Sequence, residues 1–67
     1  MGYWEKWQSA RDGLWYWHLR AGNHEIVAHG EGYTTEQGCD RGIAAVEQIL
    51  GARNTHLKLV QISDPNA

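Results

Sequence analysis

Apolar and polar side chains alternate most clearly along residues 14–20, and this alternation predicts a β-strand. One face of that strand is apolar and would meet a core; its residues are Trp15, Trp17 and Leu19. The other face is amphipathic, with Leu14, Tyr16, His18 and Arg20. This second face is therefore either solvated or part of an interface.

Three further segments have strand composition. Residues 3–9 form an aromatic strand, and the turn after it ends at Gly13, which can take a positive φ. Residues 24–29 form a short third strand, which follows Gly22-Asn23, a pair that tolerates the left-handed backbone of a primed hairpin turn. Gly30 and Gly32 end that strand. Residues 56–62 form a fourth strand, and 63–67 a frayed tail.

A helix is predicted between the third and fourth strands. Thr34 is a suitable N-cap, with Gln37 completing a capping box, and Gly51 is a natural stop. An apolar stripe at helical spacing follows the cap and consists of Cys39, Ile43, Val46 and Leu50, with Gly42 and Ile49 beside it. Gly38 and Gly42 are four residues apart, so we expect them to allow a close approach of the helix to the sheet.

These elements predict an α+β fold in which one helix packs on a small antiparallel sheet of three to four strands. With 67 residues the chain has room for one domain, and a domain of this size has marginal stability. We expect four tryptophans to be too many to hide in so small a monomer, which favours a twofold homodimer. In that dimer, residues 56–62 would add to the sheet or cross to the partner's sheet.

Composition and charge exclude several classes of function. The net charge of −2, with charges of both signs scattered, disfavours a general nucleic-acid binder. No apolar run is long enough to cross a membrane. A single cysteine and the absence of a signal-peptide pattern favour the cytoplasm.

The residues that could carry chemistry do not form a catalytic or metal-binding pattern. The histidines and Cys39 lack the close pairing of zinc ligands, and Cys39 lies on the apolar helix stripe, where it is a small core residue. No two carboxylates are set in opposed environments, as acid–base catalysis requires. We therefore expect no catalytic residues, no metal and no cofactor, and a protein that is not an enzyme.

The amphipathic face of residues 14–20 is the best candidate for binding. Tyr16, His18 and Arg20, with Trp4 or Trp7 beside them, could stack nucleobases or build a protein interface. The interface is the better interpretation because the chain lacks a basic cluster. The candidate interface residues are Trp4, Trp7, Tyr16, His18, Arg20, Leu57 and Leu59.

The order of motifs resembles the YegP-like family of small domains of unknown function. The matching segments are Trp15-Tyr16-Trp17-His18-Leu19, Ala21-Gly22-Asn23-His24-Glu25, Ile26-Val27-Ala28, Gly30-Glu31-Gly32-Tyr33-Thr34-Thr35 and Gly42-Ile43 with Val46. The resemblance covers about residues 4–50, with Trp15 where the family usually has tyrosine, and the segment after Gly51 lies outside it.

The resemblance implies a ββ(β)α unit that occurs once or as two tandem copies around a pseudo-twofold axis. This chain would then be a single-repeat member, one domain over residues 1–67, that reaches the same arrangement as a homodimer. The residues to which it gives structural roles are Trp15, Trp17, Gly22, Asn23, Gly30, Gly32, Tyr33, Thr34, Gly42, Ile43 and Val46. It supplies no catalytic residue, so the expected function is binding. Two alternatives stay open: a protein-binding modulator or adaptor of a larger complex, and a single-stranded nucleic-acid binder.

Overall fold

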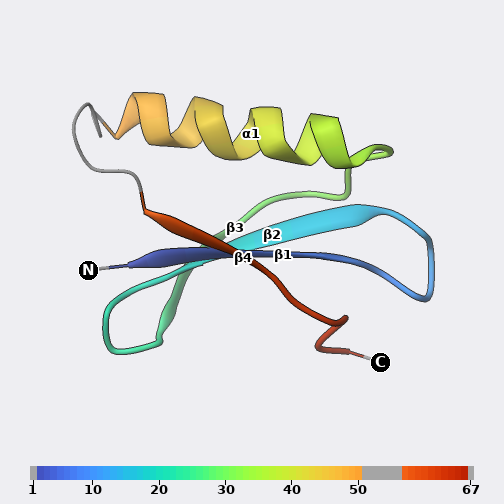
Figure 1. Ribbon diagram of the computed structural model, residues 1–67, viewed down its shortest axis with the longest axis horizontal. Coiled ribbons are helices and arrows are strands. Elements are labelled where there is room, and N and C mark those ends of the chain that lie inside the picture. The colour runs from blue at the N-terminus through green and yellow to red at the C-terminus, as the bar shows by residue number, and fades with distance from the viewer. Residues whose placement is uncertain (1, 51–56, 67) are drawn as a thin grey trace.

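The computed structural model of the chain, which describes residues 2–50 and 57–66, has one helix lying across one face of a four-stranded sheet (Figure 1). In chain order the elements are β1 (Tyr3–Gln8), β2 (Trp15–Arg20), β3 (Ile26–His29), α1 (Glu36–Ile49) and β4 (Lys58–Gln61). The strand order across the sheet is β3-β2-β1-β4. The predicted α+β class is confirmed.

The first hairpin follows from the turn chemistry of its loop. β1 and β2 pair antiparallel, with Tyr3 opposite Arg20 at one end and Gln8 opposite Trp15 at the other. Gly13 has a φ of 73°, as predicted, and its N–H donates to the carbonyl of Ser9 at 2.9 Å. The glycine can hold this left-handed backbone without a Cβ penalty, so the turn fixes the register of the two central strands.

The fourth strand corrects the prediction of a purely antiparallel sheet. β4 pairs parallel with β1 of its own chain, with Trp4 opposite Leu59. Helix α1 carries the chain back over the sheet to the end at which β3 began, so the strand that follows must run in the direction of β3 and β1. Residues 51–56, including the expected helix stop at Gly51 and the expected strand start at His56, lie outside the described residues.

The loop between β2 and β3 differs from the predicted primed turn. The left-handed residue is His24, with a φ of 72°, and not Gly22 or Asn23. The loop closes with an N–H from Ala21 to the carbonyl of Glu25 at 2.8 Å, so the strand begins only at Ile26. This is the geometry of a longer hairpin loop in which a left-handed residue follows the turn.

A β-bulge breaks the expected alternation in β3. Leu19 is opposite Ala28, whereas Arg20 is opposite Ile26, which leaves Val27 as an extra residue. Regular alternation along residues 24–29 would place Ile26 and Ala28 on the same face, and the bulge overturns this. Ala28 packs against the core, whereas Ile26 is 49% exposed.

The core lies between the helix and the inner face of the sheet. Its buried residues are Trp4, Trp17, Leu19, Cys39 and Ile43, and the half-buried residues packed against them are Trp15, Ala28, Tyr33, Val46 and Leu57. The rings of Trp4 and Trp17 meet edge to face, with centroids 5.1 Å apart. Trp4 is fully buried, and its indole N–H donates to Glu47 of α1 at 3.0 Å. Trp4 is therefore a core residue, which corrects its assignment to a binding face.

The tryptophan content is accommodated within one chain. Trp4, Trp7 and Trp17 are each less than a tenth exposed, and Trp15 is half-buried. The argument that a monomer could not hide these rings is therefore wrong.

Helix α1 begins one residue later than predicted, because its cap is Thr35 rather than Thr34. The Thr35 Oγ1 accepts the N–H of Gly38 at 3.0 Å. Cys39 and Ile43 are buried as expected, but Ile49 is 82% exposed and Leu50 is 60% exposed. The predicted apolar stripe therefore meets the core over its first three turns and leaves its last residues uncovered.

The two helical glycines have a different role from the one predicted. A Cβ at Gly42 would overlap the hydroxyl and ring of Tyr33, and a Cβ at Gly38 would be 3.7 Å from the same ring. Tyr33 in turn accepts the indole N–H of Trp17 at 3.2 Å. The glycines admit the Tyr33 ring between helix and sheet rather than bringing the helix backbone onto the strands.

A lysine is buried on the helix side of the sheet, which the sequence analysis did not foresee. Lys6 is 7% exposed, and its Nζ lies 2.7 Å from Asp40 and 2.9 Å from Glu36 of α1. Burial alone would lower the pKa of Lys6, but hydrogen bonds and charge attraction from the two carboxylates outweigh it and raise the pKa. Lys6 therefore ties β1 to the first turns of the helix as a cation.

Candidate binding face of the sheet

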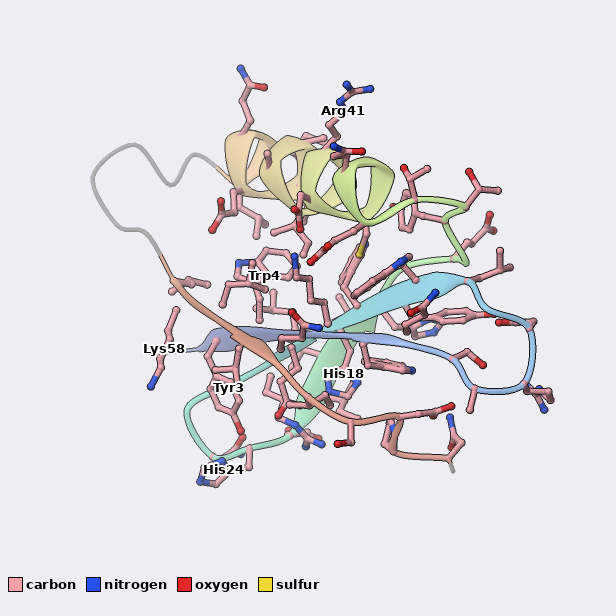
Figure 2. All side chains as sticks on the ribbon, turned by 45° about the vertical axis from the view of Figure 1, so that its right-hand side comes forward. Tyr3, Trp4, His18, His24, Arg41 and Lys58 are labelled. Atoms are coloured by element: carbon pink, nitrogen blue, oxygen red, sulfur yellow. The ribbon has the colours of Figure 1, made fainter. Side chains whose placement is uncertain are left out.

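The side of the sheet that faces away from α1 carries aromatic and charged residues of β1 and β2. Figure 2 shows Tyr3, His18 and His24 on this side and Trp4 on the helix side. We call this side the outer face; its residues on the two central strands are Tyr3, Glu5, Trp7, Tyr16, His18 and Arg20. The alternation of β2 placed Tyr16, His18 and Arg20 correctly on one face, and Trp7 joins them from β1.

One half of the outer face is a charged cluster around Glu5. The Oε1 of Glu5 accepts hydrogen bonds from the ring of His18 and from Nε of Arg20, the latter at 2.7 Å. Arg20 also donates to the carbonyl of His24 at 2.6 Å, and the His24 ring is hydrogen-bonded to the hydroxyl of Tyr3 at 2.9 Å. Burial raises the pKa of Glu5, but the bonds from Arg20 and His18 outweigh it, and the pKa is lowered. These charges satisfy one another and stabilise the β1–β2 pair.

The other half of the outer face is aromatic. The Trp7 ring is stacked on Tyr16, with centroids 5.9 Å apart and planes inclined by 18°, and its centroid is 4.9 Å from that of His18. Trp7 is 8% exposed and His18 is 5% exposed. Because these rings are covered, they do not offer the open faces on which successive bases stack.

The C-terminal segment after β4 is docked beside this aromatic half. The carboxylate of Asp64 accepts the N–H of Ala10 at 2.9 Å and that of Asn66 at 2.8 Å, and the N–H of Ile62 donates to the backbone carbonyl of Lys6 at 2.9 Å. The predicted frayed tail is therefore wrong for residues 63–66. Asp64-Pro65-Asn66 has the composition of an Asx turn, which is the signal that could have predicted it.

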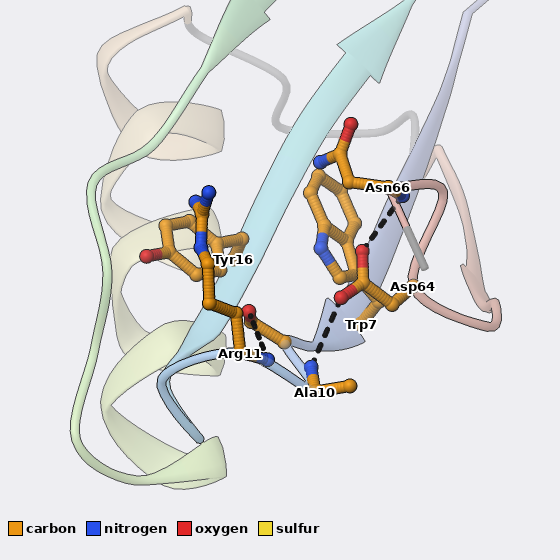
Figure 3. A pocket seen from close by; sticks show the side chains of 7 residues that line it. Trp7, Ala10, Arg11, Tyr16, Asp64 and Asn66 are labelled. Atoms are coloured by element: carbon orange, nitrogen blue, oxygen red, sulfur yellow. Dashed lines mark hydrogen bonds between the residues drawn. The ribbon is translucent and has the colours of Figure 1, made fainter.

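A pocket of about 350 Å³ lies between this segment and the β1–β2 turn (Figure 3). Its lining consists of Trp7, Ser9, Ala10, Arg11, Tyr16, Asp64 and Asn66. The hydroxyl of Tyr16 donates to Asp12 at 2.6 Å, and the Ser9 hydroxyl accepts the N–H of Arg11 at 3.2 Å. Sequence reasoning found Trp7 and Tyr16 but missed the pocket itself, because Asp64 and Asn66 reach it from the far end of the chain.

The remaining predicted interface residues do not join this face. Leu57 packs against the core beneath the helix, and Leu59 is 42% exposed at the β4 edge. The large apolar residues that are exposed, among those described, are Ile26, Val27, Ile49, Leu50 and Leu59. They lie on β3, at the end of α1 and on β4, so the exposed apolar surface lies at the edges of the fold.

The other chemical candidates are accounted for within the described residues. In that part of the chain, no three metal-ligating side chains lie together. Cys39 is fully buried, and burial, with a smaller effect of Asp40, raises the pKa of its thiol. Across residues 2–50 and 57–66, no helix has the length and apolar content to cross a bilayer.

Comparison with known proteins identifies the family. Residues 10–49, which contain β2, β3 and α1, match the model of a domain of unknown function, DUF1508. The chain belongs to the DUF1508 family. It is also similar to two UPF0339 proteins of Neisseria meningitidis, one from serogroup B and one from serogroup A. Each is 40% identical over 50 residues, which cover 75% of this chain and 88% of the relative. The predicted resemblance to YegP-like domains is confirmed, and like them the DUF1508 family carries no assigned activity.

Proposed function

We propose that this DUF1508 protein acts by binding and not by catalysis, as a twofold homodimer that pairs through the free edge of β3. The observation that carries the proposal is the exposure of Ile26 and Val27, at 49% and 56%, on a strand whose outer edge has no neighbour in the described sheet. A single reduced cysteine is consistent with a cytoplasmic protein.

The two edges of the sheet differ in a way that favours β3. A free edge presents N–H and C=O groups to any other strand, and proteins commonly protect it with a lysine. β4 carries Lys58 at its edge, whereas β3, Ile-Val-Ala-His, carries no lysine, arginine or carboxylate. Pairing of β3 with the β3 of a second copy would cover Val27 and extend the sheet across a twofold axis.

The state of the nucleophilic side chains supports a role without catalysis. The thiol of Cys39 has no exposed surface and a raised pKa, and the ammonium of Lys6 has a raised pKa and is held by two carboxylates. A nucleophile at neutral pH needs a lowered pKa and access to substrate, and these two groups have neither. The buried ring of His18 on the outer face is likewise hydrogen-bonded to Glu5.

A further protein partner is the second candidate function, supported by the end of α1. Ile49 is 82% exposed and Leu50 is 60% exposed, and neither lies on the β3 edge. Single-stranded nucleic acid has less support, because Trp7 and His18 are covered and Arg20 is bonded to Glu5.

The test is the molar mass in solution, measured by light scattering at micromolar concentration. We expect a dimer for the natural chain and a monomer for Val27→Lys, because the lysines of the two copies would lie close to each other across the twofold strand pair and repel. The matched control is Ile49→Lys, which adds the same charge at an exposed apolar site elsewhere and should leave the dimer intact. A monomeric natural chain would overturn the dimer, and dissociation by Ile49→Lys alone would overturn the β3 edge as its interface.

A further inference from the structure

We propose that the pocket between the β1–β2 turn and the C-terminal segment binds a small carboxylate that carries a flat apolar body. The pocket lies at the opposite side of β2 from the β3 edge, so the proposal is independent of the dimer. It rests on two hydrogen-bond donors at the pocket that have no acceptor among the described residues, next to carboxylates that already accept hydrogen bonds.

Two donors face the pocket without an acceptor in the described part of the chain. The indole N–H of Trp4 is bonded to Glu47 and that of Trp17 to Tyr33, but the described residues provide no acceptor for that of Trp7. Within the same residues, the contacts between basic side chains and carboxylates involve Lys6, His18 and Arg20 and leave out Arg11. Figure 3 shows the Trp7 indole and the Arg11 side chain on two sides of the pocket, with the indole nitrogen on the side nearer to Arg11 and Tyr16.

The carboxylates around the pocket, by contrast, already accept hydrogen bonds from the protein. The two carboxylate oxygens of Asp64 accept the N–H groups of Ala10 and Asn66, and Asp12 accepts the hydroxyl of Tyr16 and the N–H of Leu14. A ligand that satisfies the donors of Trp7 and Arg11 must therefore bring acceptors of its own. Two carboxylate oxygens match the fork of a guanidinium, which makes a carboxylate the anion that Arg11 would hold best.

The walls define the rest of the ligand. Trp7 is nearly covered, but its accessible part and the half-buried Tyr16 ring line the pocket and give it an apolar wall against which a small ring can pack. A volume of about 350 Å³ lies at the small end of the range for ligand sites, which fits a single-ring acid or one terminal residue of a peptide.

The probe is benzoate, titrated into ¹⁵N-labelled protein and followed by the indole N–H resonance of Trp7, which is assigned by its loss in Trp7→Phe. We expect a saturable shift of this resonance, and binding about tenfold weaker in Arg11→Gln, because a hydrogen-bonded charge is lost. The control is Arg41→Gln, which removes an equal charge from the side of α1 that faces away from the sheet (Figure 2) and should leave the affinity unchanged.

Benzamide keeps the ring and removes the charge, and it should bind about tenfold more weakly than benzoate. A short peptide ending in phenylalanine, with its terminus free or amidated, separates the sources of the carboxylate. Tighter binding of the free-ended peptide than of benzoate assigns the pocket to chain termini, and the reverse assigns it to small acids. A shift that does not saturate, equal binding of benzamide, or an equal effect of Arg41→Gln would overturn the proposal. None of these outcomes depends on whether the chain is a dimer.

Discussion

The ring of Tyr33 lies against Gly42 of α1 in the space that any side chain at position 42 would need. The ring is half-buried and packs on the core, and its hydroxyl accepts a hydrogen bond from the indole N–H of Trp17. The glycine therefore costs the helix about 1 kcal/mol of propensity relative to alanine, and the fit of Tyr33 compensates for it. The corner before the helix, the helix and the central strand meet at this one contact.

We predict that Gly42→Ala lowers the free energy of unfolding by about 1–2 kcal/mol, since overpacking outweighs the gain in helix propensity. Urea unfolding followed by tryptophan fluorescence measures it. Gly38→Ala is the matched control and should cost less, because its nearest neighbour is Thr35 Oγ1 at 3.2 Å. In a Tyr33→Phe background, which removes the hydroxyl closest to position 42, the cost of Gly42→Ala should shrink. An equal cost in both backgrounds would contradict the contact.

The sequence could predict those features of the fold that depend on local patterns. The alternation of β2 identified Trp17 and Leu19 as core residues, and helical spacing identified Cys39 and Ile43. The alternation could not show which of Trp4 and Trp7 lies in the core. β1 reads Tyr-Trp-Glu-Lys-Trp-Gln, so its two tryptophans lie three residues apart on opposite faces, and each face contains one of them. Burial of Lys6 depends on carboxylates of α1 that lie thirty or more residues further along the chain, so no local pattern could show it.

The candidate site was predictable to the same extent. The face that holds Trp7, Tyr16, His18 and Arg20 followed from alternation, whereas the pocket depends on a bond between Ala10 and Asp64, at opposite ends of the chain. The direction of β4 likewise depends on the path of the helix over the sheet and not on residues 58–61 themselves.

Removal of Lys6 and removal of the negative charges of Glu36 and Asp40 should have unequal effects on the free energy of unfolding. Lys6→Met places an apolar chain of similar length at a buried position and leaves Glu36 and Asp40, each nearly half exposed, to be solvated. We expect it to cost no more than about 1 kcal/mol of unfolding free energy. The double change Glu36→Gln with Asp40→Asn leaves the buried ammonium without a counter-charge, and should cost about 2 kcal/mol.

The control for the double change is Glu36→Gln alone, because Glu36 also stabilises the first turn of α1. Urea unfolding at neutral pH gives all three values. A larger loss for Lys6→Met than for the double change would show that the ion pairs themselves, and not the desolvated ammonium, dominate this contact.

Glu5 should make the free energy of unfolding depend on pH in the acidic range. Its pKa is lowered below the ordinary value of 4.5, since the bonds from Arg20 and His18 outweigh burial. A carboxylate with a lowered pKa in the folded state contributes stability that is present above its ordinary pKa and is lost as the pH falls through the folded value. We therefore predict that the free energy of unfolding decreases below pH 4.5, and that Glu5→Gln is less stable at neutral pH but loses less on acidification. Urea unfolding at a series of pH values measures the free energy of unfolding of both proteins.

Asp12→Asn is the control, because the pKa of Asp12 is also lowered, by Tyr16 and Leu14, but Asp12 lies outside this cluster. In Asp12→Asn, the free energy of unfolding should still show the loss on acidification that Glu5 causes. If the free energy of unfolding of Glu5→Gln changed with pH in parallel with that of the natural chain, the cluster would not couple protonation to folding.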